Sequence, residues 1–403
     1  MSIRLKYARQ TFRLILAFLL TKTFCRHLFN KEIWLIGEKK TEARDNAYHF
    51  FKYVRENHPE INAYFVITRD SSDLSKVERY GNIIYHNTIK HYVYFLSAKN
   101  NINSQLPHSM FPVWSSLIRR IPFLLNKKQN SVFLKHGIIY TKMSPRDLDY
   151  KESGLAIISC SAEREKNFIW KTYGYPENNI QLLGLCRFDN LHNIDSNIKR
   201  QILVMPTYRS WLVASDRTKR ASTMEMQRFA NSRFCQTYLC FLNNEILHQL
   251  LELYNYKMVF YPHYSFQSYI DLFKEMVINS RITIADRFHY DVQELLISSA
   301  IMITDYSSVF FDFAYMKKPE IFFQFDEEEF QEKHYLKKGY FSYKNDGFGS
   351  VVRNIDKLLK ELERVMLNDA KIEDKYLKRV EEFFTVHDTN NCKRTFNAIS
   401  NLK

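Results

Sequence analysis

Short runs of apolar residues alternate with helix-period patterns along most of the chain. Runs at 32–37 and 61–68 have the length of buried strands, and the amphipathic stretch 43–56 lies between them. Strands that alternate with helices form parallel sheets with crossover helices, so the first part predicts an α/β fold. The predicted strands of this part are 32–37, 61–68, 82–85, 131–136, 155–160 and 181–183, and the predicted helices are 43–56, 73–80, 88–98 and 163–173.

The same alternation begins again after a polar stretch at 193–199. We therefore expect two α/β halves joined near residue 195, with a cleft for a ligand between them. The predicted strands of the second half are 202–205, 258–261, 282–284, 301–304 and 321–325, and the predicted helices are 233–254 and 292–298. The predicted organisation is an amphipathic segment at 1–30, α/β domains at 31–195 and 196–370, and a charged helical segment at 371–403.

The N-terminal segment MSIRLKYARQTFRLILAFLLTKTFCRHLFN combines apolar residues at helical spacing with many basic residues. Its uninterrupted apolar run, from Leu14 to Leu20, is far shorter than the roughly 20 residues that cross a bilayer. No small-residue cleavage site follows, as a signal peptide would need. The pattern favours a helix in the interface of an anionic membrane. The alternative is a first helix that packs on the body of the protein.

Composition narrows the class of protein without choosing a substrate. The chain is 45% hydrophobic and 25% charged, which is typical of globular proteins and argues against disorder or a fibre. The formal charge of +14 would attract phosphate-bearing substrates, acidic lipids or nucleic acid. No nucleic-acid-binding motif accompanies that charge, so we expect no nucleic-acid partner. The six cysteines are scattered without zinc-ligand spacing, which favours a reduced chain.

The sharpest local motif is IMITDYSSVFFDFAYMKKP at 301–319. A predicted strand stops at Asp305, and a polar turn leads into an apolar stripe of helical period. Ser307 or Ser308 is predicted to cap that helix and to leave N–H groups free for a phosphate. Plain capping without a ligand is the alternative.

Three further residues follow predicted strands. His136 and His263 occupy matching strand ends in the two halves, where an imidazole could move a proton near neutral pH. Arg209 lies beyond the strand at 202–205 and could clamp a phosphate through its fork of donors. Structural histidines and a surface arginine are the alternatives. Asp147 and Asp149 match a loose metal-binding DxD pattern that often arises by chance, so we expect no metal there.

Together these segments resemble the CDP-glycerol glycerophosphotransferases, which build teichoic acids and related phosphopolymers. The resemblance covers roughly residues 32–350. It rests on 301–319 with the preceding DVQELL, LKHGI at 134–138, GLCRFDNL at 184–191, MPTYR at 205–209 and YPHYS at 261–265.

The resemblance implies a GT-B-like fold, with two Rossmann-like domains facing a central cleft. The domain at 31–195 would take the acceptor, and the domain at 196–370 would bind the CDP-polyol. His136 would be the general base, and His263 would stabilise the transferring phosphate or the leaving group. The substrate-binding residues would be Arg209, Glu294, Thr304, Asp305, Ser307 and Ser308.

The implied reaction transfers glycerol phosphate from CDP-glycerol to a hydroxyl of a membrane-linked glycan or polyol-phosphate acceptor, with release of CMP. It would take place at the cytoplasmic face of a bacterial membrane, to which the protein would attach peripherally. These residues require no metal or other cofactor, and Mg²⁺ has no support in the sequence. Because the sequence shows no large extra domain, a single transfer is as compatible with it as polymerisation.

Four positions depart from the pattern of many members. Lys135 and Tyr208 stand where tryptophan is common, Tyr261 replaces a basic residue, and Tyr264 replaces a proline. These departures leave the polyol and the acceptor open. Three alternatives therefore remain, namely a CDP-ribitol ribitolphosphotransferase, a GT-B glycosyltransferase that releases UDP or GDP, and a catalytically silent scaffold at the membrane surface.

Overall fold

The computed structural model describes residues 3–105, 129–143, 148–192, 198–214 and 221–402. The chain divides into two compact units. The first unit comprises Met1–Ile138, Ser144–Asn190 and Val386–Lys403, and the second comprises Ile139–Met143 and Leu191–Thr385.

The first unit is built on a seven-stranded parallel sheet with the order β3-β2-β1-β4-β5-β6-β7. Its central strands are buried on both faces, as crossover helices require. The strands are β1 (Trp34–Gly37), β2 (Ala63–Ile67), β3 (Ile83–Tyr85), β4 (Asn100–Asn103), β5 (Asn130–Phe133), β6 (Ile157–Cys160) and β7 (Ile180–Leu182). The helices are α1 (Ile3–Lys22), α2 (Asn46–Asn57), α3 (Leu74–Glu78), α4 (Ile89–Ser97), α7 (Tyr150–Ser153), α8 (Glu163–Tyr173) and α19 (Asn391–Ser400).

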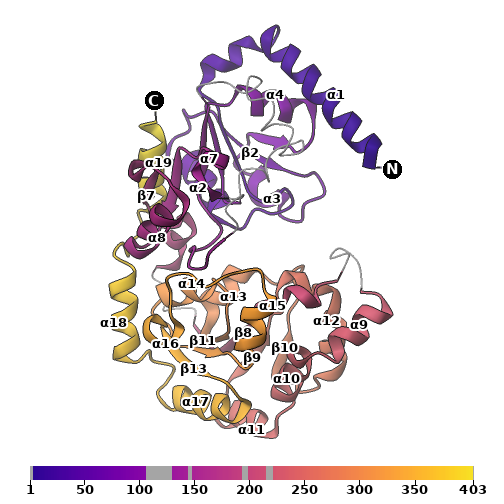
Figure 1. Cartoon of the computed structure of the whole chain (residues 1–403), viewed down its shortest axis with the longest axis vertical. Helices are drawn as coiled ribbons and strands as arrows, with labels where there is room; N and C mark the ends of the chain where they lie inside the picture. The colour runs from indigo at the N-terminus through magenta and orange to yellow at the C-terminus, as the bar shows by residue number, and fades with distance from the viewer. Residues whose placement is uncertain (1–2, 106–128, 144–147, 193–197, 215–220, 403) are drawn as a thin grey trace. The chain divides into compact units, whose positions relative to one another are not determined.

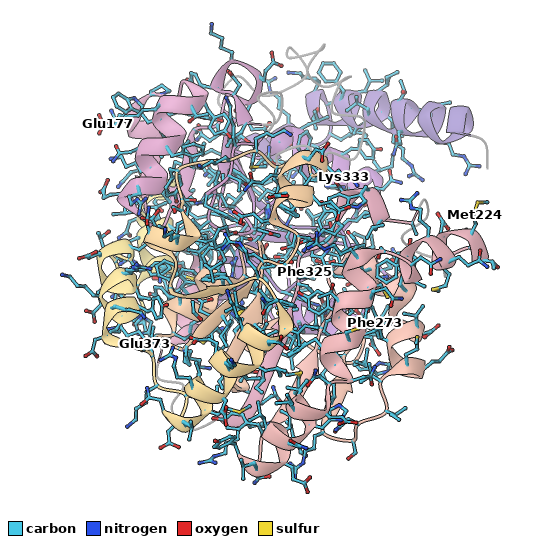
Figure 2. The ribbon with its side chains drawn as sticks, turned by 60° about the horizontal axis from the view of Figure 1, so that its bottom comes forward. Glu177, Met224, Phe273, Phe325, Lys333 and Glu373 are labelled. Carbon is cyan, nitrogen blue, oxygen red and sulfur yellow. The ribbon has the colours of Figure 1, made fainter. Side chains whose placement is uncertain are left out.

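The second unit repeats this topology in a six-stranded parallel sheet with the order β10-β9-β8-β11-β12-β13. Its core is rich in aromatic side chains, among them Phe273 and Phe325, which Figure 2 labels. The strands are β8 (Lys199–Met205), β9 (Lys257–Phe260), β10 (Ile282–Ile284), β11 (Ser299–Thr304), β12 (Glu320–Phe323) and β13 (Gly349–Val352). The helices are α9 (Thr223–Ala230), α10 (Arg233–Leu242), α11 (Glu245–Leu253), α12 (Ile270–Met276), α13 (Val292–Ser298), α14 (Phe310–Tyr315), α15 (Glu327–Lys333), α16 (Tyr343–Asp346), α17 (Ile355–Leu367) and α18 (Asp374–Phe383).

In both sheets the strand order reverses once. Successive strands are first added on one side of β1 or β8 and then on the other side, so the switch point lies between β1 and β4 in one sheet and between β8 and β11 in the other. In parallel sheets of this kind, ligands bind beyond the carboxyl ends of the strands near such a switch point. The α/β class that the sequence predicts is confirmed, and the carboxyl edge of each sheet is the place to look for chemistry.

Helix α1 packs against α4 through one face and leaves the other exposed (Figure 1). Leu14 and Ala17 are buried, whereas Phe12, Ile15 and Leu19 are 66%, 56% and 55% exposed. The packing of one face on α4 agrees with the expectation of a first helix that packs on the body of the protein, and contact of the other face with a membrane stays a prediction. Within the described part of the chain, no helix has the length and apolar character that a membrane span needs.

Several described elements differ from the sequence prediction, and strand β13 is among those that were not predicted. Strand β4 was not predicted, because three of its four residues are asparagines, which are rare in strands. The predicted helix at 233–254 is wrong as one helix, since α10 ends before Asn243 and α11 begins after Asn244. The Asn244 side chain accepts hydrogen bonds from the N–H groups of Ile246 (2.9 Å) and Leu247 (3.3 Å), which caps the second helix.

The C-terminal helices do not form the single segment expected at 371–403. Helix α18 belongs to the second unit and α19 to the first. The Asp189 carboxylate accepts hydrogen bonds from the N–H groups of Asn391 (2.8 Å) and Cys392 (2.9 Å), and the His58 ring stacks on Phe396. These contacts attach the last helix to the first sheet.

Candidate functional site

In the first unit, His136 lies just beyond the carboxyl end of β5, and its side chain is exposed. No described residue bonds its ring nitrogens. The preceding residue, Lys135, has a positive φ of 61° and a fully buried side chain paired with Glu165. The chain therefore turns sharply at the end of the sheet and presents the imidazole to solvent.

The surroundings of His136 favour the neutral ring. Partial desolvation by neighbouring protein atoms, together with the positive charges of Arg187, Lys39 and Lys135, lowers the pKa of His136 below the usual value of histidine. A neutral imidazole can accept a proton, so the side chain has the charge state that a general base needs.

In the second unit, Arg209 is fully buried between two carboxylates. Its guanidinium binds Asp326 through Nε (2.6 Å) and Nη2 (2.9 Å), and it binds Asp305 through Nη1 (2.9 Å). Nη1 also donates to the carbonyl of Thr207 at 2.6 Å. Burial opposes the charged form, but Asp305 and Asp326 outweigh it and raise the pKa of Arg209 above its usual value.

This geometry corrects the role expected for Arg209 at a phosphate. Every nitrogen of its guanidinium is engaged inside the unit, so none is open to a ligand. Asp305 and Thr304, expected among the substrate-binding residues, are fully buried as well. The Thr304 hydroxyl donates to the carbonyl of Met205 (2.8 Å), and Asp305 accepts from the N–H of Thr207 (2.8 Å). These three residues fasten β8 to β11 at the switch point of the sheet.

Ser307 and Ser308 lie in the turn that follows β11, and both are half-buried. The predicted capping by either serine is wrong, because α14 begins later, with Val309 at its N-cap and no side-chain cap. The serine carbonyls, rather than the hydroxyls, accept from Phe310 (3.3 Å) and Phe311 (3.2 Å). Neither hydroxyl has a hydrogen-bond partner among the described residues, so both can bind a ligand.

His263 follows β9 at the same edge of the sheet. Its Nδ1 accepts a hydrogen bond from the N–H of Ser265 at 3.2 Å, so a neutral ring carries its proton on Nε2. The ring stacks on Tyr208, with centroids 4.5 Å apart, and contacts Tyr264. Two positions that depart from the resembling family thus flank this histidine, and a neutral His263 is a hydrogen-bond donor at Nε2.

A third histidine, His334, has no counterpart in the sequence prediction. It is 1% exposed, and its ring stacks on Phe330 at a centroid distance of 4.4 Å. Its Nδ1 accepts from the N–H of Leu336 at 3.2 Å, and its Nε2 has no partner within the described ranges. Desolvation, with the nearby charges of Arg209 and Lys337, lowers the pKa of His334 to about 4.

Glu294 lies in the first turn of α13 with an exposed side chain, and Asp291 caps this helix. No described residue bonds the Glu294 carboxylate, so its role at a ribose or polyol stays a prediction. Asp147 lies outside the described residues. Within the described ranges, no group of three His, Cys, Asp or Glu side chains could hold a metal ion.

The sequence prediction missed the residues that support those it identified. Asp305 comes directly after β11 and Asp326 lies three residues beyond the end of β12, so an acidic residue close behind a predicted strand was the available signal. Arg187 donates to the carbonyl of His136 at 2.9 Å, and Asn46 donates to the carbonyl of Lys135 at 2.8 Å. Arg187 lies in the segment 184–191, which the sequence analysis identified, but the spacing of residues does not show that it bonds the His136 carbonyl.

The chain matches a family model over residues 19–401, and that family is described as CDP-Glycerol:Poly(glycerophosphate) glycerophosphotransferase. It is 32% identical over 376 residues to the minor teichoic acid biosynthesis protein GgaB of Bacillus subtilis (strain 168), a match that covers 93% of this chain and 40% of GgaB. It is 24% identical over 375 residues to the teichoic acid poly(glycerol phosphate) polymerase of the same strain, over 87% of this chain and 46% of that protein. The chain thus spans less than half the length of these relatives.

Among solved structures, the fold is similar to that of the wall teichoic acid polymerase TagF, with a TM-score of 0.66. The match covers 100% of both chains at 17% sequence identity. At this identity the likeness concerns the fold alone, and it confirms the GT-B-like class that the resemblance implied.

Proposed function

The chain belongs to the CDP-glycerol:poly(glycerophosphate) glycerophosphotransferase family, and from that premise we propose that it transfers glycerol phosphate from CDP-glycerol to an acceptor hydroxyl. CMP is the second product. The acceptor is a membrane-linked glycan or polyol-phosphate chain of a cell-surface polymer. The observation that carries the proposal is the position, at the carboxyl edges of the two sheets, of side chains that bond no other described residue, namely His136 in one unit and Ser307 with Ser308 in the other.

The reaction is a displacement at phosphorus. The acceptor oxygen attacks the phosphorus that carries the glycerol, and the bond from that phosphorus to the bridging oxygen breaks. CMP leaves with the electron pair of that bond, and a phosphodiester forms. The acceptor proton passes to the neutral imidazole of His136, which later releases it to water. Such a displacement needs mainly positioning and charge stabilisation.

The second unit supplies the donor-binding groups in this proposal. The Ser307 and Ser308 hydroxyls bind the diphosphate, and Nε2–H of His263 donates to the oxygens that gain charge. Arg209, Asp305 and Asp326 do not touch the donor. Their buried network holds the turn after β11 against the end of β8, so that the serines stay in place.

We also propose that the exposed face of α1 lies on the anionic inner surface of the cell membrane. Phe12, Ile15 and Leu19 are exposed on this helix, and the sequence around them is rich in lysine and arginine. Apolar side chains enter the headgroup boundary while basic side chains bind acidic lipid. The triple change of these three residues to serine should abolish sedimentation with phosphatidylglycerol vesicles. Unchanged sedimentation would contradict this proposal.

The test of the reaction is CMP release from CDP-glycerol by purified protein, with and without a membrane extract as acceptor. We expect release that depends on the acceptor, with glycerol phosphate recovered in the acceptor fraction. CDP-ribitol and a nucleotide sugar serve as competing donors. Acceptor-dependent turnover of the nucleotide sugar, with none of either CDP-polyol, would overturn the proposal in favour of a glycosyltransferase.

A further inference from the structure

The turn that carries His136 is held through two successive backbone carbonyls. The Asn46 side chain donates from Nδ2 to the carbonyl of Lys135 at 2.8 Å, and Arg187 donates from Nη1 to the carbonyl of His136 at 2.9 Å. Asn46 is the first residue of α2, and Arg187 lies in the segment after β7. Two elements far apart in the sequence thus meet on this turn.

The two donors are also bonded to each other. The N–H of Arg187 donates to Oδ1 of Asn46 at 3.0 Å, and Nη1 of Arg187 binds Oδ1 of Asp45 at 2.8 Å. Asp45 is in turn the N-cap of α2. We name Asp45, Asn46 and Arg187 the carbonyl clamp, since together they fix the peptide groups on both sides of the His136 Cα atom.

The turn has a reason to need such a clamp. Lys135 is in the left-handed region, which a residue with a Cβ atom adopts only at a cost, and its side chain is anchored by the buried pair with Glu165. The Glu165 carboxylate also accepts from the N–H of Ser161 at 2.9 Å. Anchored in this way, the strained backbone of Lys135 presents its carbonyl and that of His136 to the clamp.

We propose that Arg187 is a positioning residue for His136, acting through the carbonyl of His136 and through Asn46. This inference rests on the proposed function, in which His136 accepts the acceptor proton. In this role Arg187 acts through the backbone of the turn and does not itself take the proton. It fixes the direction in which the imidazole leaves the sheet, and loss of this direction slows proton transfer without weakening the donor site of the other unit.

The charge of Arg187 gives a readout that a purely structural residue would lack. The charged groups around His136 are Arg187, Lys39 on the β1–α2 loop and Lys135, with Asp45 bonded to Arg187 and Glu165 paired with Lys135. Removing the Arg187 charge removes a repulsion from the protonated ring and takes away the counter-charge of Asp45. Both changes raise the pKa of His136.

The experiment compares Arg187→Gln and Arg187→Lys with the matched control Arg394→Gln in the full chain. Arg394 also binds a carboxylate and a carbonyl in the first unit, Asp388 (2.9 Å) and Leu183 (3.1 Å), but it makes no bond to the His136 turn. The measurements are the pKa of His136, from ¹³C-labelled histidine by NMR with His136→Gln for assignment, and kcat and KM for CDP-glycerol against pH.

We expect Arg187→Gln to raise the pKa of His136 by roughly 1 unit. The acid limb of the profile of kcat against pH should move to higher pH by the same amount. We expect kcat to fall about 10-fold or more, with the KM for CDP-glycerol unchanged. Arg187→Lys keeps the charge but not the planar fork, so it should restore the pKa and only part of kcat. The control should change neither quantity.

An Arg187→Gln variant with the pKa and kcat of the control would overturn the inference, even if both variants unfold at a lower temperature. An equal loss in kcat for Arg187→Gln and Arg394→Gln would also overturn it. Failure of the proposed function gives a different result, because His136→Gln would then keep its CMP release. The NMR titration reports the influence of Arg187 on His136 whatever the reaction.

Discussion

The two sheets have the same strand order around their switch points, but they use their carboxyl edges differently. In the first unit, an exposed imidazole leaves the edge from a turn that is held through its backbone carbonyls and through the buried pair of Lys135 with Glu165. In the second, the edge is filled by a buried ionic network of Arg209, Asp305 and Asp326, next to a turn whose serine hydroxyls bond no other described residue. In the proposed function, one topology thus supports both a side chain that accepts a proton and a turn that binds an anion.

The difference teaches how to separate reactive residues from supporting ones in this chain. Both edges contain polar or charged residues after strands, and the sequence pattern alone does not distinguish those of one edge from those of the other. Burial distinguishes them, since Arg209 and Asp305 are fully buried, whereas His136 is exposed and Ser307 and Ser308 are half-buried. The following predictions test this distinction in order of decreasing expected effect.

The largest effect is expected for Arg209→Met. The change leaves Asp305 and Asp326 buried without a counter-charge, so the free energy of unfolding should fall by ~3–5 kcal/mol. The matched control is Arg353→Gln, which removes an exposed pair with Glu327 and should cost ~0–1 kcal/mol. Urea unfolding measures both. A stable Arg209→Met variant with a raised KM for CDP-glycerol would instead make Arg209 a ligand of the donor.

The second prediction concerns the buried histidine of the second unit. The pKa of His334 in the folded protein is about 4, whereas an unfolded histidine has a pKa of about 6.5. Between these values the unfolded chain binds a proton that the folded chain does not, so stability falls as the pH is lowered from 6.5 towards 4. His334→Gln lacks this titration.

Unfolding of the wild-type chain and the His334→Gln variant at pH 7 and pH 4.5 isolates this contribution, because the other titrating groups are common to both. The wild-type chain should lose ~2–3 kcal/mol more than the variant over this interval. Equal losses would show that His334 is not held neutral by its surroundings. The buried edge would then be less different from the exposed one than the structure indicates.

The smallest effect is expected for the turn after β11. Replacing Ser307 and Ser308 with alanine should weaken CDP-glycerol binding by ~1–2 kcal/mol, roughly 10-fold in Kd, because two donors to the diphosphate are lost. The free energy of unfolding should stay the same, since neither hydroxyl bonds a described residue. Ser298→Ala, at a hydroxyl that donates to the Leu295 carbonyl, is the control for binding. Calorimetric binding equal to that of the control would place the diphosphate elsewhere.

The sequence predicted most of the fold because the fold depends on local patterns. Apolar runs located 11 of the 13 strands that the described ranges contain, and the helix at 163–173 has the predicted bounds. Strand β4 was not predicted, because its burial depends on the neighbouring strands rather than on its own composition. The break between α10 and α11 depends on the helix cap at Asn244, and the spacing of apolar residues carries no information about such a cap.

The sequence located the residues to which we assign reactive roles, but it did not locate the residues that support them. His136 and His263 follow predicted strands, so a local pattern locates them. The partners of Arg209 and His136 come from distant segments, with Asp326 117 residues from Arg209 and Arg187 51 residues from His136. Such pairs are set by the order of strands in a sheet. For that reason Arg209 appeared to be a ligand of phosphate until its carboxylate partners were known.

The central claim is that the first unit supplies the base and the second unit holds the donor. The most direct test is the pair of measurements on His136→Gln, its CMP release with acceptor and its Kd for CDP-glycerol. The account predicts a loss of turnover of ~10²–10⁴-fold with the Kd unchanged. Retained turnover, or a weakened Kd that explains the lost turnover, would contradict it.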